Sequence, residues 1–152
     1  MKRAKQILDY VSTQDKAMLA YTARDMLLAA HSDAGYLNDT NARSRAGGHF
    51  FLSNNAENPA NNGAILTIAQ IIKNVMTSAV EAGIGDLYII VQEAVYIRII
   101  LNEMGHKYPR TPVQTDNSTA EGVINNKMQP NQTKAIAIHF HLLLCKPAQA
   151  KF

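Results

Sequence analysis

The chain has one cysteine in 152 residues, so an internal disulfide is excluded and a reducing compartment suits the protein. That residue, Cys145, follows the apolar residues 142–144, a pattern typical of a buried thiol rather than a nucleophile. Long hydrophobic runs are also lacking. The run at 94–101 is interrupted by Arg98 and is far shorter than the roughly 20 residues of a membrane span. No secretory apolar core follows the basic N-terminus, so we expect an intracellular protein, cytoplasmic or nuclear, with no signal peptide and no membrane partner.

Low-complexity tracts and internal repeats are also absent. The length suits one domain, and a hydrophobic content of 47% is sufficient for that domain to bury a core. The net charge is +3, which suits a polyanionic partner such as a nucleic acid. Small basic domains of many functions share that charge, so it does not identify the partner.

Hydrophobic spacing predicts three strands, a long helix, a fourth strand and two further helices behind a short amphipathic N-terminal helix. The N-terminal helix is expected at 4–11, the strands at 25–31, 49–52, 64–72 and 112–116, and the later helices at 78–104, 117–125 and 133–145. The last segment alternates in a way that also fits a buried strand. We read 32–36 and 53–63 as loops, 38–41 as a turn, 126–131 as a linker, Gly47-Gly48 as a turn or bulge, and Gly105 as a helix C-cap. The order predicts an α/β fold, a mixed sheet with helices packed against it.

Three acidic residues stand at the ends of these predicted elements. Asp33 ends the first strand, Glu81 opens the long helix, and Asp116 ends the fourth strand. Carboxylates so placed can converge, and their oxygens are the ligands that Mg²⁺ prefers. Two such ions can activate a water and stabilise the leaving oxygen of a phosphodiester. The alternative reading is that these residues are helix caps and solvated loop positions.

Several longer motifs resemble the RNase H domain of copia-type retrotransposon polyproteins, in order and spacing over nearly the whole chain. The matching segments are His31-Ser32-Asp33-Ala34-Gly35-Tyr36, Arg43-Ser44-Arg45-Ala46-Gly47-Gly48-His49-Phe50-Phe51-Leu52, Gln114-Thr115-Asp116-Asn117-Ser118-Thr119-Ala120 and Thr133-Lys134-Ala135-Ile136-Ala137-Ile138-His139-Phe140-His141. The helix around residues 5–10 resembles the connector from the reverse transcriptase of such polyproteins. This resemblance divides the chain into a connector and lead-in at 1–24, an RNase H-like domain at 25–146, and a tail at 147–152.

The resemblance implies an RNase H fold whose carboxylates bind two Mg²⁺ or Mn²⁺ ions and cut the RNA strand of RNA–DNA hybrids. By motif position, Asp33 is the first carboxylate and Asp116 the third. The implied partners are an RNA–DNA hybrid or other nucleic acid and a reverse transcriptase domain upstream in the same polyprotein. Side chains that could contact the nucleic acid are Arg43, Arg45, Asn117, Ser118 and Lys134. Solvated surface cations and a helix cap explain these five residues equally well.

The pattern of that family is broken in several places. Its glutamate ligand falls on Gly83, and Glu81 lies about 200° away around the helix, so Glu81 could serve only if the helix frays or shifts. Ala137 replaces an aspartate of the late segment. The fifth strand and fourth carboxylate are expected to be missing, which would leave a sheet edge open and invite association. With Asp33 and Asp116 alone, we expect at most one weakly held ion.

Two hypotheses follow, and whether the chain is an enzyme stays open between them. The first is a ribonuclease H that hydrolyses the RNA of hybrids, with Asp33 and Asp116 holding metal and Glu81 as a conditional third ligand. The second is a decayed copy that keeps the sheet and weak affinity for hybrids without turnover. We favour ancestry from the first with the present chemistry of the second. A product with no selected role is a third, weaker reading.

Overall fold

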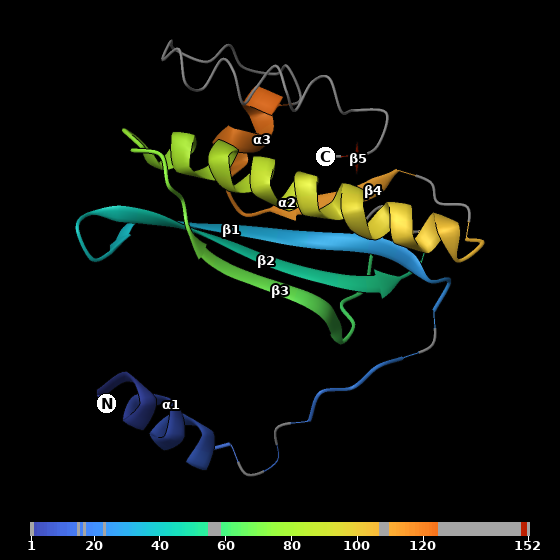
Figure 1. The fold of residues 1–152 in the computed structure, drawn as a ribbon, viewed down its shortest axis with the longest axis horizontal. Helices are drawn as coiled ribbons and strands as arrows, with labels where there is room; N and C mark the ends of the chain where they lie inside the picture. The colour runs from blue at the N-terminus through green and yellow to red at the C-terminus, as the bar shows by residue number, and fades with distance from the viewer. Residues whose placement is uncertain are drawn as a thin grey trace.

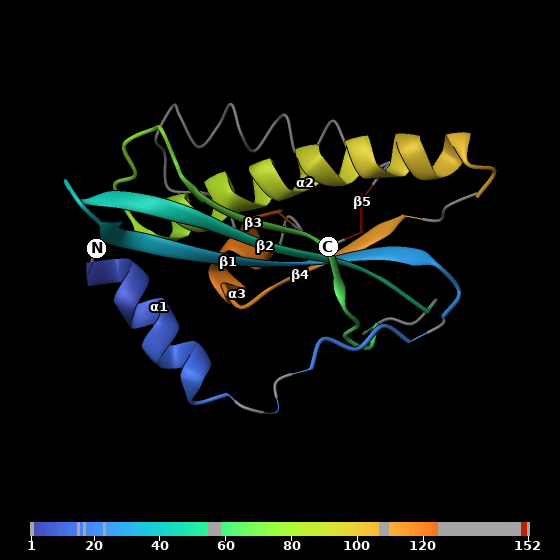
Figure 2. The same cartoon turned by 60° about the horizontal axis from the view of Figure 1, so that its bottom comes forward.

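The computed structural model describes residues 2–14, 16, 18–22, 24–54, 59–106, 110–124 and 150–151. Its elements are α1 (Lys2–Ser12), β1 (Leu27–Asp39), β2 (Arg43–Ser53), β3 (Ala64–Ile71), α2 (Ala79–Glu103), β4 (Thr111–Thr115), α3 (Ser118–Ile124) and β5 (Ala150–Lys151). A twisted sheet forms one layer, with α2 over one side of it and α1 on the other (Figures 1 and 2), and α3 packs against α2.

The sheet has the strand order β3-β2-β1-β4-β5. β2 pairs antiparallel with β1 on one side and with β3 on the other, and β4 lies parallel to β1. This is the predicted α/β architecture, three antiparallel strands plus a parallel fourth flanked by helices, and it is consistent with an RNase H-like fold. The predicted absence of a fifth strand needs correction. Two residues of the segment predicted to be a tail form β5, which pairs in parallel with β4 at Thr111 and Pro112.

The first hairpin is longer than the sequence predicts. β1 continues through residues 32–36, which we predicted as a loop, because β2 pairs with it as far as Gly35. β2 begins at Arg43 and includes Gly47 and Gly48 inside the strand, so the predicted turn there is wrong. The turn at 40–42 lies close to its predicted position, with Asn41 and Ala42 at positive φ. β3, β4 and α1 agree with their predicted positions within two residues at each end.

The main core lies between α2 and the sheet. Alternate strand residues such as Leu28, Ala30 and Phe50 face Leu87 and Ile90 of α2, and these side chains are almost fully buried. Gly48 lies directly under the helix, since a Cβ there would come within 2.3 Å of Cδ1 of Ile90. A side chain at this position would push α2 away from the sheet.

The ends of α2 follow capping chemistry read from the sequence. Ser78 is the N-cap, and its hydroxyl accepts a hydrogen bond from the amide of Glu81. Met104 is the C-cap, and Gly105 follows with a φ of +90°, a conformation that glycine adopts without steric cost. The predicted helix and its closing glycine are therefore confirmed. The glycine-rich first turns hold because the helix packs tightly there: a Cβ on Gly85 would lie 2.8 Å from Cε of Met76.

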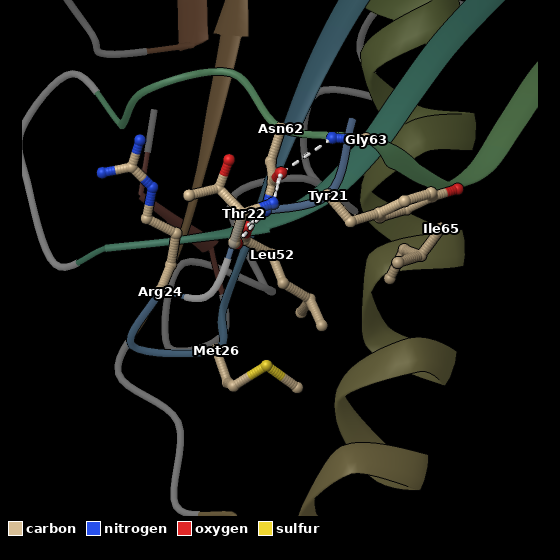
Figure 3. A pocket seen from close by; sticks show the side chains of 8 residues that line it. All are labelled: Tyr21, Thr22, Arg24, Met26, Leu52, Asn62, Gly63 and Ile65. Atoms are coloured by element: carbon tan, nitrogen blue, oxygen red, sulfur yellow. Dashed lines mark hydrogen bonds between the residues drawn. The ribbon is translucent and has the colours of Figure 1, made fainter. Parts of the chain in front are cut away.

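The lead-in before β1 is fixed where it crosses the start of β3. The side chain of Asn62 accepts from the amide of Thr22 at 2.8 Å and donates to the carbonyls of Thr22 and Leu52. The Tyr21 ring covers Gly63, and its hydroxyl donates to the carbonyl of Ala64 at 2.9 Å. Figure 3 shows these residues around a shallow pocket. By contrast, α1 has no buried residue.

In the described part of the chain, no helix is long and apolar enough to cross a membrane. The predicted linker at 126–131, the predicted helix at 133–145 with Lys134, and Cys145 lie outside the described residues. Ala137, the departure noted in the late segment, also lies outside them.

Candidate carboxylate site

Asp33 and Asp116 lie side by side where the parallel pairing of β1 with β4 ends: Asp33 is in the middle of β1, and Asp116 follows the last residue of β4. Ser32 of β1 is in register with Thr115 of β4, and each aspartate is the next residue in its chain. Neighbouring strands are separated by about 4.8 Å, so the two backbones are close at this level. Both side chains are exposed. The structure therefore brings these two predicted site residues together.

Strand alternation places Asp33 on the sheet face opposite α2. Ser32 faces α2, because its hydroxyl donates to Asp86 of that helix, so Asp33 must face the other way. Gln114 hydrogen-bonds His31, which lies two residues before Asp33 on the same face of β1. Asp116 lies two residues after Gln114, so alternation places it on that face as well. By register, the two carboxylates thus occupy one face, which we call the open face.

Gly47 leaves the space beside Asp33 unfilled. It is the residue opposite Asp33 on β2, and a Cβ there would lie 2.8 Å from the carbonyl oxygen of Asp33. Glycine is thus required by the close approach of the two backbones. Without a side chain at position 47, the Asp33 carboxylate is not screened from that side.

Further along the open face is a ring cluster of His31, His49 and Phe51, with centroids 5.1 to 6.2 Å apart. Burial lowers the pKa of His31, a hydrogen bond with Gln114 raises it, and the neighbouring His49 lowers it. The cluster therefore favours a neutral imidazole at position 31.

Glu81 does not join the two aspartates. Its Oε2 accepts hydrogen bonds from the amide and hydroxyl of Thr77, both at 2.6 Å, and the residue is buried. With Ser78 it satisfies backbone donors at the start of α2, the role of a capping glutamate. The proposed use of Glu81 as a third ligand is therefore not supported by its position, because its carboxylate is engaged at the start of α2.

The position expected to carry the ligand is filled by a different residue. A Cβ on Gly83 would lie 2.7 Å from Nδ2 of Asn117 and 3.2 Å from Cβ of Ala120. Asn117 follows Asp116 directly, so position 83 lies beside the neighbour of Asp116, on the α2 side of the sheet. Here the amide of Asn117 occupies that space and donates to the carbonyl of Ala79 at 3.3 Å.

Asp86 is a carboxylate at this site that sequence reasoning missed. It has no exposed surface, and its Oδ2 accepts from the Ser32 hydroxyl at 2.5 Å, while Oδ1 is buried without a hydrogen bond of ordinary geometry. Burial raises the pKa of Asp86 to about 7. The Ser32 hydroxyl and the Gly47 amide oppose that shift, and the charges of Asp33 and Asp116 add to it. Asp86 is thus electrostatically coupled to both aspartates from the α2 side of β1.

The predicted nucleic-acid contacts divide into free and engaged side chains. Arg43 is exposed at the start of β2, and Ser118 is exposed at the start of α3. Arg45 forms an ion pair with Asp39 at 2.5 Å, and this shared charge lowers its value as a phosphate contact. Asn117 caps α3, accepting from the amide of Ala120 at 3.0 Å, so the helix-cap alternative describes its role in the fold.

These residues do not fit a two-ion centre. Among the described residues, no group of three or more His, Cys, Asp or Glu side chains is placed to hold a metal ion. The reasons are local: Glu81 caps its own helix, position 83 is glycine, and Asp86 is separated from Asp33 by β1 itself. Two exposed carboxylates could supply part of the oxygen shell of one hydrated ion.

Comparisons of the chain with protein families, with curated proteins and with solved structures found no match.

Proposed function

We propose that the chain is an RNase H-like domain derived from a copia-type retrotransposon polyprotein, which binds RNA–DNA hybrids but has lost efficient cleavage. In this proposal it acts inside the cell, in the cytoplasm or nucleus, beside a reverse transcriptase domain. Asp33 and Asp116 hold one Mg²⁺ or Mn²⁺ weakly, and a bound ion would offset the repulsion between the carboxylates and a phosphate.

The observation that carries the proposal is the register of β1 and β4. Ser32 pairs with Thr115, so two exposed aspartates end up adjacent where the pairing of β1 with β4 stops. Asp116 lies just beyond the carboxyl end of β4, the position at which ligand sites form in open α/β sheets. The motifs around these residues resemble those of copia-type RNase H domains, and the mixed sheet is consistent with an RNase H-like fold.

Impaired cleavage follows from the carboxylates that are out of place. Two-ion hydrolysis needs a negative cage that fixes both ions against the attacking and leaving oxygens. Here the side chain facing that space from α3 is the neutral Asn117, and α2 supplies glycine at position 83. Asp86 is buried and raised in pKa, so part of it is protonated near neutral pH.

The test combines hybrid binding and hybrid cleavage on the intact chain. Fluorescence anisotropy of a labelled RNA–DNA hybrid should show binding that weakens as salt rises, because Arg43 and other cations contact phosphates. Mg²⁺ should strengthen that binding, and Asp33→Asn should abolish only the Mg²⁺-dependent part. Asp9→Asn, an exposed aspartate on α1, is the matched control and should change nothing.

Cleavage of the same hybrid is then measured with Mg²⁺ and with Mn²⁺. We expect no metal-dependent product above the level of Asp33→Asn. Cleavage that this substitution abolishes would overturn the proposed loss of activity and restore the enzyme hypothesis. Absence of hybrid binding at low salt would overturn the nucleic-acid role and leave the reading of a product with no selected role.

A further inference from the structure

β3 forms one edge of the sheet and pairs only with β2 among the described elements. Its eight residues are Ala64-Ile65-Leu66-Thr67-Ile68-Ala69-Gln70-Ile71, with no proline, no glycine and no charge. Natural proteins usually protect an edge strand with lysines, prolines or a covering element, because its free amides and carbonyls recruit other strands. β3 has no such protection in its sequence.

The outward-facing backbone groups of β3 can be assigned by alternation. The amide of Ile72 donates to the carbonyl of Ser44 in β2, so the groups of Gln70 and Ile68 point toward β2 as well. Those of Thr67, Ala69 and Ile71 therefore point away from the sheet. A second strand placed there would find a regular ladder of donors and acceptors.

The lead-in covers only the beginning of this edge. Tyr21 lies against Gly63 and bonds the carbonyl of Ala64, and Thr22 is held by Asn62 (Figure 3). Beyond Ala64, no hydrogen bond joins the described residues of the lead-in to β3. With respect to the described residues, the uncovered part of the edge is therefore the backbone of 65–71, with the Ile65 side chain lining the pocket beside Tyr21.

We propose that this edge is a dimerisation surface, on which β3 of a second copy of the chain adds antiparallel to β3 about a two-fold axis at Ile68. In this register Ile68 faces its own copy, Thr67 faces Ala69 of the partner, and Ile65 faces Ile71 of the partner. The outward groups of Thr67 and Ala69 then form the hydrogen-bonded pairs. In this register all of residues 65–71 pair with the second copy, and the pairing stops next to Ala64, where Tyr21 covers the edge.

The side chains favour a copy of the same strand as the occupant. On the α2 side, Leu66 and Ile68 are only half-buried members of the core, and the partner's residues would cover their exposed surface. On the open side, Thr67 and Ala69 are small and exposed, so nothing bulky obstructs the approach.

Charges do not oppose the pairing. Lys73 is the only charged residue in 59–74. In the proposed register the two copies of Lys73 are ten residues apart along the ladder, which is about 34 Å at the strand rise. Like charges are destabilising only when they face each other across strands, so no repulsion arises at this edge.

Sedimentation velocity over a series of protein concentrations tests the proposal. The intact chain should dimerise reversibly, and Thr67→Lys should raise the dimer dissociation constant at least about tenfold, because it places two lysines near the axis. Thr119→Lys, an exposed threonine on α3, is the charge-matched control and should dimerise like the parent. Circular dichroism melting confirms that both variants are folded.

The register is tested by crosslinking in a Cys145→Ser background. Thr67→Cys with Ala69→Cys in one chain should form intermolecular disulfides on mild oxidation, since facing residues have Cα atoms about 5.5 Å apart. Thr67→Cys alone should form no such disulfide, because the cysteine at position 67 of each copy faces Ala69 of the other copy. A monomer at all concentrations, a dimer that Thr67→Lys leaves intact, or equal crosslinking of the single and double variants would each overturn the proposal.

Discussion

At the residue scale, Asp86 shows how a single buried carboxyl couples α2 to the middle of β1. It is fully buried, bonded to Ser32, and within electrostatic reach of Asp33 and Asp116. The sequence contained a signal for it: positions 83, 86, 87 and 90 share one face of the helix, so Asp86 interrupts the stripe that meets the sheet. A charged residue at a core position is a stronger indication of a site than one at a helix end.

The pKa of Asp86 predicts an unusual pH dependence of stability. Because the folded pKa is raised from 3.8 to about 7, the folded state holds a proton that the unfolded state has lost. The free energy of unfolding should therefore fall as pH rises from about 4 to about 7, by an amount on the order of a few kcal/mol. Asp86→Asn should remove this slope and raise stability at pH values above about 7.

Urea unfolding at a series of pH values checks this expectation, with Asp9→Asn as the exposed control. An Asp86→Asn profile parallel to that of the parent would contradict it. Asparagine keeps an oxygen that can accept from Ser32, so the comparison isolates the charge rather than the hydrogen bond.

Glu81 leads to a second prediction at this scale. Glu81→Ala removes the acceptor of two hydrogen bonds from Thr77 and should lower the free energy of unfolding by about 1 kcal/mol. The affinity for Mn²⁺, measured by titration calorimetry, should stay the same, because the carboxylate does not face Asp33 or Asp116. A clear loss of Mn²⁺ affinity would restore Glu81 to the site.

At the element scale, α1 contributes little to the fold that follows it. None of its residues is buried, and its apolar side chains Ile7, Leu8 and Val11 are each more than half exposed. The chain is instead attached to the sheet through Tyr21 and Thr22. Deleting residues 2–12 should leave the melting temperature unchanged within error, whereas Tyr21→Ala should lower it. Equal loss in the two variants would show that α1 packs on the domain.

At the scale of the whole molecule, the sequence predicted the architecture better than the site. Helix α2, strand β4 and the mixed sheet follow from periodicity and capping residues, which act locally. The extension of β1 through Ser32 and Asp33 could not be predicted from local pattern, because polar and glycine residues there indicate a loop. This part of β1 is a strand because β2 and β4 pair with its backbone from the two sides. Asn117 facing Gly83 likewise depends on contacts between α2 and α3 that no sequence spacing encodes.

The hydrogen bonds of Asn62 to Thr22 and Leu52 have a consequence for the chemical stability of the protein. Asparagine followed by glycine is the dipeptide that most readily loses ammonia, when the next backbone nitrogen attacks the side-chain carbonyl. In the folded chain that nitrogen, on Gly63, is engaged with Oδ1 of Asn62, and the amide is fixed to Thr22 and Leu52. Folding thus protects the side-chain amide of Asn62 from this reaction. An aspartate formed at position 62 would have no N–H to donate to the carbonyl oxygens of Thr22 and Leu52. Deamidation of Asn62 would therefore release the lead-in and extend the uncovered edge of β3 from 65–71 to Ala64.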